Sequence, residues 1–118
     1  MTPQEFQGRI ARNESFLLAN DGQYLGKLVL NKYDSESISN QYGSYGSKYS
    51  STSILNKYSN YGSPYSSLSP YNKYTNTPPI IYLRGVKYGF LTKNRYVGGV
   101  WLDPEDLGSW LQQNNLSY

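Results

Sequence analysis

The chain has 118 residues, and 11 Lys and Arg against 8 Asp and Glu leave a formal net charge of +3. It contains no Cys and no His, which excludes disulfides, thiolate nucleophiles, Cys/His zinc sites and histidine general bases. A chain of this length predicts a single domain (1–118) with one modest core. Only 37 % of the residues are hydrophobic and fourteen residues are Tyr, so we expect this core to include tyrosine rings whose hydroxyls are hydrogen-bonded.

The sequence does not predict a membrane protein. The first sixteen residues contain no apolar h-region, and no apolar run approaches the roughly 18 residues that a spanning helix needs. The expectation is therefore a cytoplasmic protein with no membrane partner.

The chain begins with a helix signature. Thr2 can cap a helix, Pro3 suits its first position and Glu5 completes a capping box, which predicts a helix over 3–12. A β-hairpin is expected next, over 15–30, because two apolar runs flank the turn sequence Asn20-Asp21-Gly22.

A triple repeat with a period of 16 residues follows over 33–79. Its rows read YDSESISNQYGSYGSK (33–48), YSSTSILNKYSNYGSP (49–64) and YSSLSPYNKYTNTPP (65–79). The Ser-rich sequence favours hydroxyl-to-backbone turns, and Tyr-Gly-Ser favours a tight turn. We expect three similar units whose aligned Tyr stack on one another and whose aligned Asn bond the backbone.

A second hairpin is predicted over 80–96, with its turn at Arg84-Gly85. Residues 22–33 align without gaps on 85–96 with five identities in twelve positions. We therefore expect two related hairpins that flank the repeat and that pair in one sheet.

The C-terminal part predicts a short apolar strand or docking segment at Val100-Trp101-Leu102 and a helix over 103–113. Asp103 can cap this helix and Pro104 suits its first position. The fold class is then mainly β, α+β at the margins, with a short helix at each terminus.

Cations and tyrosines are paired along the chain. Six of the eleven Lys and Arg immediately precede a Tyr, against about 1.3 expected from the composition. Aromatic rings interleaved with cations are typical of sequence-tolerant single-strand nucleic-acid surfaces. The competing interpretation places the repeats in strands, where neighbouring residues face opposite sides, so that Tyr points into the core and Lys points out.

Other chemistries have weaker support. Exposed Tyr beside Asn and Ser could stack on a sugar ring. Asp34 and Glu36 lack the convergent oxygens of a calcium site, and no nucleophile elbow or phosphate loop occurs. We expect no catalytic residue, no metal, no cofactor and no enzyme activity.

Residues 21–96 resemble a group of uncharacterised small bacterial proteins, including cyanobacterial ones. The resemblance is carried by the D-G-x-x-L-G-x-L motif at Asp21–Leu28, the repeats, Pro78–Ile81 and the G-x-x-x-G-x-L motif at Gly85–Leu91. It implies a bacterial, non-enzymatic protein and brings no further function.

The function expected from these patterns is a binding or scaffold module that presents a repetitive Tyr/Asn/Lys surface to a protein partner. The alternative is single-stranded nucleic-acid binding through the Lys-Tyr pairs, and self-association through an open sheet edge is a third possibility. Exposed rings would favour the nucleic acid, and an exposed Trp110 would favour an apolar docking patch. The candidate surface residues are Lys48, Lys57, Lys73, Tyr42, Tyr58, Tyr74, Trp101 and Trp110.

Overall fold

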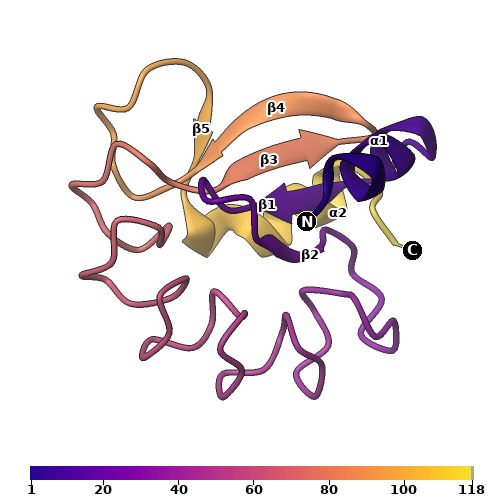
Figure 1. The fold of residues 1–118 in the computed structure, drawn as a ribbon, viewed down its shortest axis with the longest axis horizontal. Coiled ribbons are helices and arrows are strands. Elements are labelled where there is room, and N and C mark those ends of the chain that lie inside the picture. Colours follow the sequence, from indigo (N-terminus) through magenta and orange to yellow (C-terminus); the bar gives the residue numbers. More distant parts are fainter. Residues whose placement is uncertain (118) are drawn as a thin grey trace.

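The computed structural model describes residues 1–117. In chain order the elements are α1 (Pro3–Ala11), β1 (Phe16–Leu18), β2 (Tyr24–Lys27), β3 (Ile80–Leu83), β4 (Val86–Leu91), β5 (Trp101–Leu102), the 3-10 helix η1 (Pro104–Asp106) and α2 (Leu107–Gln113). The strands form one sheet in the order β2-β1-β3-β4-β5, as Figure 1 shows. The expected mainly-β class with short helices near the ends is confirmed.

Both predicted hairpins exist, and they pair with each other. β1 and β2 are antiparallel, as are β3 and β4, and β1 pairs β3 in register from Phe16↔Tyr82 to Leu18↔Ile80. The hairpin turns use Gly22 (φ 91°) and Gly85 (φ 81°), in the left-handed region that glycine tolerates. The last strand, β5, runs parallel to β4.

Both predicted capping residues, Thr2 and Asp103, accept a backbone N–H with their side chains. Thr2 Oγ1 accepts a hydrogen bond from the N–H of Glu5 (3.2 Å) at the start of α1. Asp103 accepts from the N–H of Glu105 (2.9 Å), but the turn that it caps is the 3-10 helix η1, and α2 begins only at Leu107. The helix expected over 103–113 is therefore divided into two parts.

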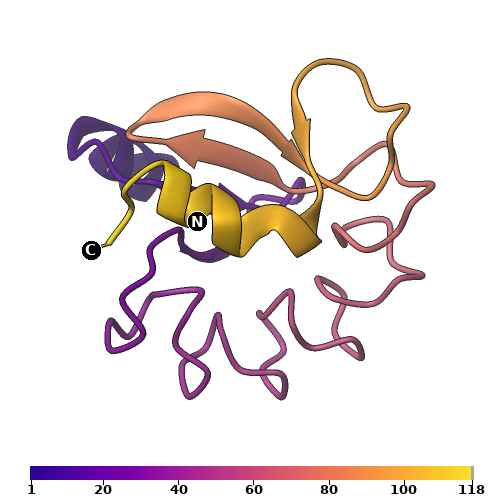
Figure 2. The same ribbon diagram turned by 180° about the vertical axis from the view of Figure 1, so that it is seen from behind.

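The segment 31–79, here called the coil, contains no strand and is a succession of turns. After Ser47, the backbone N–H groups of Ser50, Ser53, Asn56 and Ser59 each donate to the carbonyl three residues earlier, which makes steps of three residues. The N–H of Ser63 then donates to the carbonyl of Ser59, which makes a step of four residues. Four steps of three and one of four make up the 16-residue period. Figures 1 and 2 show this segment as a series of small loops along an arc that leads from β2 to β3 in the chain.

Polar side chains hold these turns in place. At most turn starts a Ser, Thr, Asn or Asp side chain accepts a hydrogen bond from the N–H two residues on, as from Tyr49 to Ser47 Oγ (3.1 Å). The residues that accept in this way are Asp34, Ser37, Asn40, Ser47, Ser50, Ser53, Asn56, Ser59, Ser63, Ser66, Ser69, Asn72 and Thr75. The expectation of hydroxyl-to-backbone turns is confirmed, and it explains a composition so rich in Ser and Asn.

Glycine is needed at the four-residue step because the backbone folds back closely there. A Cβ added at Gly46 or at Gly62 would lie 2.2 Å from the carbonyl oxygen of Asn40 or Asn56. No other residue type avoids this contact without a backbone shift.

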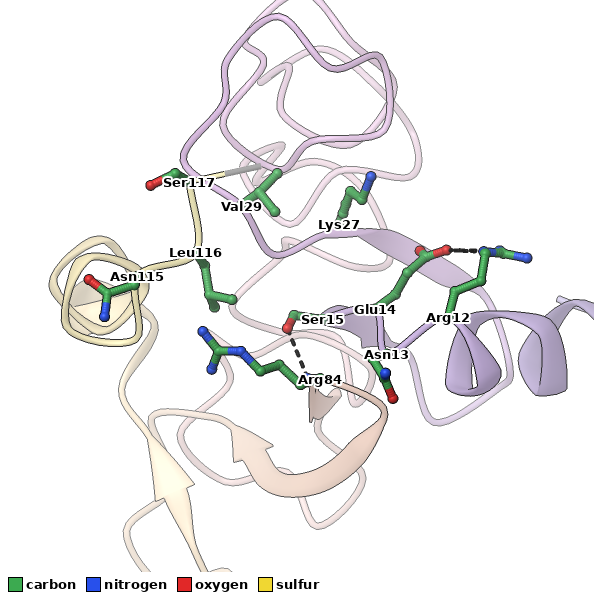
Figure 3. Close-up of a pocket in the computed structure, with 10 residues that line it drawn as sticks. All are labelled: Arg12, Asn13, Glu14, Ser15, Lys27, Val29, Arg84, Asn115, Leu116 and Ser117. Atoms are coloured by element: carbon green, nitrogen blue, oxygen red, sulfur yellow. Dashed lines mark hydrogen bonds and ion pairs between the residues drawn. The ribbon is translucent and has the colours of Figure 1, made fainter.

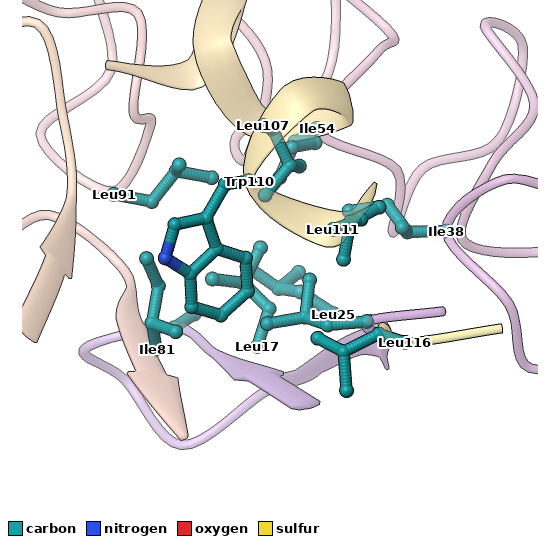
Figure 4. Packing of buried hydrophobic residues seen from close by; sticks show 12 residues of the cluster. Leu17, Leu25, Ile38, Ile54, Ile81, Leu91, Leu107, Trp110, Leu111 and Leu116 are labelled. Carbon is teal, nitrogen blue, oxygen red and sulfur yellow. The ribbon is translucent and has the colours of Figure 1, made fainter. Parts of the chain in front are cut away.

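The core lies between the sheet and the coil, with α2 between them (Figures 1 and 2). Figure 4 shows the indole of Trp110 among side chains from all three layers. The cluster contains Leu17, Ala19, Leu25, Leu28, Ile38, Ile54, Ile81, Leu91, Leu107, Trp110, Leu111 and Leu116.

The expectation that the repeat tyrosines build this core is wrong for six of them, whereas Tyr61 packs against the core cluster and Tyr45 packs edge-on against Tyr24 with ring centroids 4.9 Å apart. The tyrosines of the coil at 33, 42, 49, 58, 65 and 74 are 80–92 % exposed. Each repeat instead sends one apolar residue inward at the equivalent position: Ile38, Ile54 and Pro70 are buried. Because the coil bonds its own backbone, a few apolar contacts per repeat are enough to fix it to the core.

Candidate binding surface on the coil

Seven tyrosines form an exposed series that we call the tyrosine row. Their side chains are 80–95 % exposed. The members are Tyr33, Tyr42, Tyr49, Tyr58, Tyr65, Tyr74 and Tyr96. The expected stacking of aligned tyrosines on one another is also wrong, because the aromatic ring pairs found within residues 1–117 include no member of the row.

The orientation of the row follows from the turns. In the coil each of these tyrosines stands third in a triplet that starts with the residue accepting its N–H, as in Asn56-Lys57-Tyr58, where the N–H of Tyr58 donates to Asn56 Oδ1 (3.0 Å). The triplet turns back on itself, so its second and third side chains both point outward. The interpretation that Tyr points in and Lys points out therefore fails here, since it assumed the alternation of a strand.

Five exposed cations accompany the row, each immediately before one of its tyrosines. They are Lys32, Lys48, Lys57, Lys73 and Arg95. No ion pair within the described residues involves any of them. The sixth pair differs, because Tyr88 lies on β4 and packs against Trp110 with ring centroids 5.1 Å apart.

The electrostatic setting of the row is positive. Between residues 37 and 102 the sequence contains seven Lys and Arg and no Asp or Glu. The carboxylates of Asp34 and Glu36, at the start of the coil, are already paired with Lys27 (3.1 Å) and Arg9 (3.0 Å). A negatively charged ligand would therefore meet uncompensated positive charge along most of the row.

Asparagine side chains connect neighbouring members of the row. Asn56 Nδ2 donates to the carbonyl of Ser50 (3.0 Å), the residue that follows Tyr49, while Asn56 Oδ1 holds the N–H of Tyr58. The side chain thus fixes Tyr49 and Tyr58 relative to each other, and we call this arrangement an asparagine clamp. The expectation that aligned Asn bond the backbone is confirmed.

Two grooves lie between cation–tyrosine pairs. The first has a volume of about 360 Å³ and is lined by Lys48, Tyr49, Leu55, Asn56, Lys57 and Tyr58. The second has a volume of about 410 Å³ and is lined by Lys73, Tyr74, Lys93, Asn94, Arg95 and Tyr96.

The structure divides the sequence-predicted surface residues into two groups. Lys48, Lys57, Lys73, Tyr42, Tyr58 and Tyr74 are all exposed on the coil. Trp101 lies away from the coil on β5 and is 37 % exposed, whereas Trp110 is only 5 % exposed and belongs to the core. The apolar docking patch that an exposed Trp110 would have formed is therefore absent.

The candidate surface residues expected from the sequence did not include Lys32, Tyr33, Tyr49, Tyr65, Arg95 and Tyr96. The signal for Arg95 and Tyr96 was available, because Asn94-Arg95-Tyr96 aligns with Asn31-Lys32-Tyr33 at the end of the related hairpin. In the structure the N–H groups of Tyr33 and Tyr96 donate to Asn31 Oδ1 and Asn94 Oδ1, both at 2.9 Å. The two aligned segments make the same turn.

Another pocket, drawn in Figure 3, lies where the ends of α1 and α2 approach the β3–β4 turn. Its charged groups already have partners: Arg12 pairs with Glu14 (2.8 Å), Lys27 pairs with Asp34, and the Arg84 guanidinium donates to the carbonyl of Asn114. We interpret this pocket as a packing contact between these elements and not as a ligand site.

A buried polar cluster links α1 to the start of the coil. Arg9 contacts Glu14 (2.8 Å), Glu36 (3.0 Å) and the hydroxyl of Tyr24 (3.2 Å). Burial raises the pKa of Tyr24 well above its usual range, so the phenol stays protonated. Within residues 1–117 no group of three or more Asp and Glu is arranged to hold a metal ion.

Comparison with protein-family models, with curated proteins and with solved structures finds no match to this chain. Within the described residues, both helices are too short and too polar to cross a membrane. The geometry of the coil is therefore the basis for the functional argument.

Proposed function

We propose that this protein is a non-catalytic binding module whose tyrosine row and adjacent cations bind single-stranded nucleic acid. The observation that carries the proposal is the exposure of the rings. Seven tyrosines are 80–95 % exposed, and five of them follow an exposed, unpaired cation. Large aromatic side chains held in water by an ordered backbone suggest a ligand with flat surfaces of its own.

The chemistry of a single strand matches this surface. Each unstacked base offers a face to a phenol ring, and such stacking contributes about 1–3 kcal/mol per base. The phosphates meet Lys and Arg that form no ion pair with a carboxylate within the described residues. Both amide atoms of the clamping asparagines are engaged with the backbone, so binding should be tolerant of base sequence.

A protein partner is the second candidate, and one observation favours it. Leu55 is 46 % exposed and lines an apolar groove of about 350 Å³ with Ile54, Pro64 and Tyr71. Self-association through a sheet edge has less support, because the edge strand β5 is two residues long and the edge strand β2 is four. We favour the nucleic acid because the row offers seven exposed rings and five exposed cations, whereas Leu55 is the one large exposed hydrophobic residue that lines this groove.

The test is fluorescence anisotropy of labelled thirty-nucleotide oligothymidylate and oligouridylate at several salt concentrations. The wild-type protein should bind at low salt and weaken as salt rises. The variant K48Q/K57Q/K73Q should bind more weakly, and the slope of log K against log [salt] should fall in magnitude by about 2, since each phosphate contact to a single strand contributes about 0.7. The control is K87Q, which removes an exposed lysine of β4 outside the row.

Two further probes separate the sources of affinity. An abasic oligomer of the same length keeps the phosphates and removes the bases, so it should bind much more weakly if the rings stack on bases. Absence of binding at low salt, or equal losses in K87Q and in the triple variant, would contradict the proposal. Binding to poly-glutamate as tight as to the oligonucleotides would identify an acidic protein segment as the partner instead.

A further inference from the structure

We propose that the tyrosine row contains two equivalent nucleotide subsites, one between Tyr49 and Tyr58 and one between Tyr74 and Tyr96. One molecule would then hold a single strand at two places. This inference rests on the proposed function and specifies which parts of the row contact the ligand.

The two grooves have similar linings, which differ at one residue: Leu55 in the first and Lys93, paired with Asp103 and Glu105, in the second. Each contains a Lys-Tyr pair from one turn, Lys48-Tyr49 or Lys73-Tyr74. Each is completed by an Asn-cation-Tyr triplet from a second segment, Asn56–Tyr58 or Asn94–Tyr96. Both grooves therefore offer two phenol rings and two exposed cations to one ligand.

The same asparagine clamp fixes the two halves of each groove. In the first, Asn56 Nδ2 donates to the carbonyl of Ser50, directly after Tyr49. In the second, Asn94 Nδ2 donates to the carbonyl of Thr75, directly after Tyr74 (2.9 Å). The Oδ1 atoms accept from the N–H groups of the second tyrosines at 3.0 and 2.9 Å. The two tyrosine pairs are therefore connected by the same pattern of hydrogen bonds.

The equivalence is created by the tertiary structure. Tyr49 and Tyr58 belong to one stretch of coil, but Tyr74 lies in the last repeat and Tyr96 lies beyond β4. The segment after β4 docks on the coil, where the N–H of Lys93 donates to the carbonyl of Pro70 (2.8 Å) and Asn94 reaches Thr75. It takes the place that the next repeat would have occupied.

Two other clamped pairs exist, and both are incomplete. Asn40 connects Tyr33 to Tyr42, and Asn72 connects Tyr65 to Tyr74, through the same two bonds. In these pairs one of the two cations is replaced, by Gln41 before Tyr42 and by Pro64 before Tyr65. A phosphate would meet one positive charge there instead of two, which distinguishes the two complete pairs as subsites.

Each subsite would bind one or two nucleotides. A base can stack on a phenol face while the two cations contact the flanking phosphates. Lys73 Nζ lies 5.8 Å from the ring centroid of Tyr74, so cation and ring can act on the same nucleotide. A strand that reaches both grooves gains from effective concentration, and losing one subsite should lower its affinity about 100-fold.

The experiment uses the full chain with ¹³C-labelled tyrosine rings, whose signals are assigned by single Tyr→Phe substitutions. A four-nucleotide oligothymidylate is titrated by NMR. A thirty-nucleotide oligothymidylate is titrated in parallel by anisotropy. The variants are K48Q/K57Q for the first subsite and K73Q/R95Q for the second. The matched control is R12Q/K87Q, which removes the same charge at two exposed cations outside the tyrosine row.

In the wild type, the short probe should shift the signals of Tyr49, Tyr58, Tyr74 and Tyr96. K48Q/K57Q should lose the first two shifts only, and K73Q/R95Q the last two only. Each should weaken binding of the long probe about 100-fold, while the control stays within a few-fold of the wild type. These are exposed side chains, so the dispersed amide spectrum should show that every variant is folded.

The outcomes separate this inference from the proposed function. If the long probe binds but the shifts spread evenly over the row, or one double variant abolishes both groups of shifts, the two-subsite inference is wrong and the nucleic-acid function stands. If neither probe binds the wild type at low salt, both fail.

Discussion

At the residue scale, asparagine is the side chain on which the surface depends. An amide offers a donor and an acceptor at once, and each clamp uses both on the backbone. Serine hydroxyls make comparable pairs of bonds, since Ser50 Oγ accepts from the N–H of Thr52 (3.3 Å) and donates to the carbonyl of Ser44 (2.6 Å). The asparagines that recur once in each repeat, at 40, 56 and 72, use their two bonds to connect members of the tyrosine row.

Replacing Asn56 by Ala should destabilise the protein. The substitution leaves the carbonyl of Ser50 and the N–H of Tyr58 without their side-chain partners, a loss of about 1–3 kcal/mol. Urea denaturation followed by circular dichroism measures the change. N60A is the control, because Asn60 is exposed and its side chain makes no hydrogen bond within residues 1–117. Equal effects of N56A and N60A would mean that the clamp does not stabilise the coil.

At the element scale, the coil depends on how its ends are joined to the sheet. At its start the backbone of Lys27 exchanges two hydrogen bonds with the coil, donating to Glu36 (2.8 Å) and accepting from Ile38 (3.0 Å). The Lys27 ammonium also pairs with Asp34 at 3.1 Å. The chain therefore leaves β2 and enters the first turns through a bonded joint, not through a free linker.

The joint predicts an acid-dependent stability. The N–H of Glu36 donates to the Asp34 carboxylate, and this bond, together with Lys27, holds the pKa of Asp34 below its usual 3.8, although burial acts in the opposite direction. Because the folded-state pKa is the lower one, the stabilisation is present above the unfolded-state pKa and is lost as the pH falls through the folded-state pKa.

The variant D34N should therefore be less stable than the wild type at pH 7, and the difference should shrink between about pH 5 and about pH 2. Urea denaturation at a series of pH values measures it. D106N controls for the loss of one carboxylate, because Asp106 is exposed and does not cap α2 with its side chain. A difference between D34N and the wild type that stays constant down to pH 2 would show that the charge of Asp34 does not stabilise the joint.

At the scale of the whole molecule, α2 is the element that packs between the sheet and the coil. Its Trp110, Leu111 and Leu107 meet the sheet on one side and Ile38 and Ile54 of the coil on the other. Figure 2 shows α2 lying along the inside of the arc. The coil has few apolar residues of its own, so its position depends on this helix.

Replacing Trp110 by Ala should cost about 3–5 kcal/mol, because it opens a large cavity between the layers. W101A should cost nearer the 1 kcal/mol typical of point substitutions, since Trp101 is 37 % exposed. Urea midpoints of the two variants test the difference between the two indoles. Similar losses in both would indicate that α2 is not the centre of the core.

The local features of this protein could be predicted from its sequence because their causes lie within a few residues. Thr2 and Asp103 cap the turns that follow them, and Gly22 and Gly85 close the hairpins. The 16-residue period and the role of Asn as a backbone-bonding residue also followed from local patterns. The gapless alignment of 22–33 with 85–96 correctly indicated equivalent positions, since Leu28 and Leu91 are both fully buried.

The direction of the tyrosines, the place of Trp110 and the second groove were decided only by the tertiary structure. A period of 16 is compatible with strands or with turns, and the two place Tyr58 on opposite sides. The burial of Trp110 depends on a coil that wraps over α2. The pairing of Tyr74 with Tyr96 depends on a hydrogen bond from Asn94 to Thr75, 19 positions apart in the chain. Such contacts form only when separate elements are already folded, so no local pattern can show them.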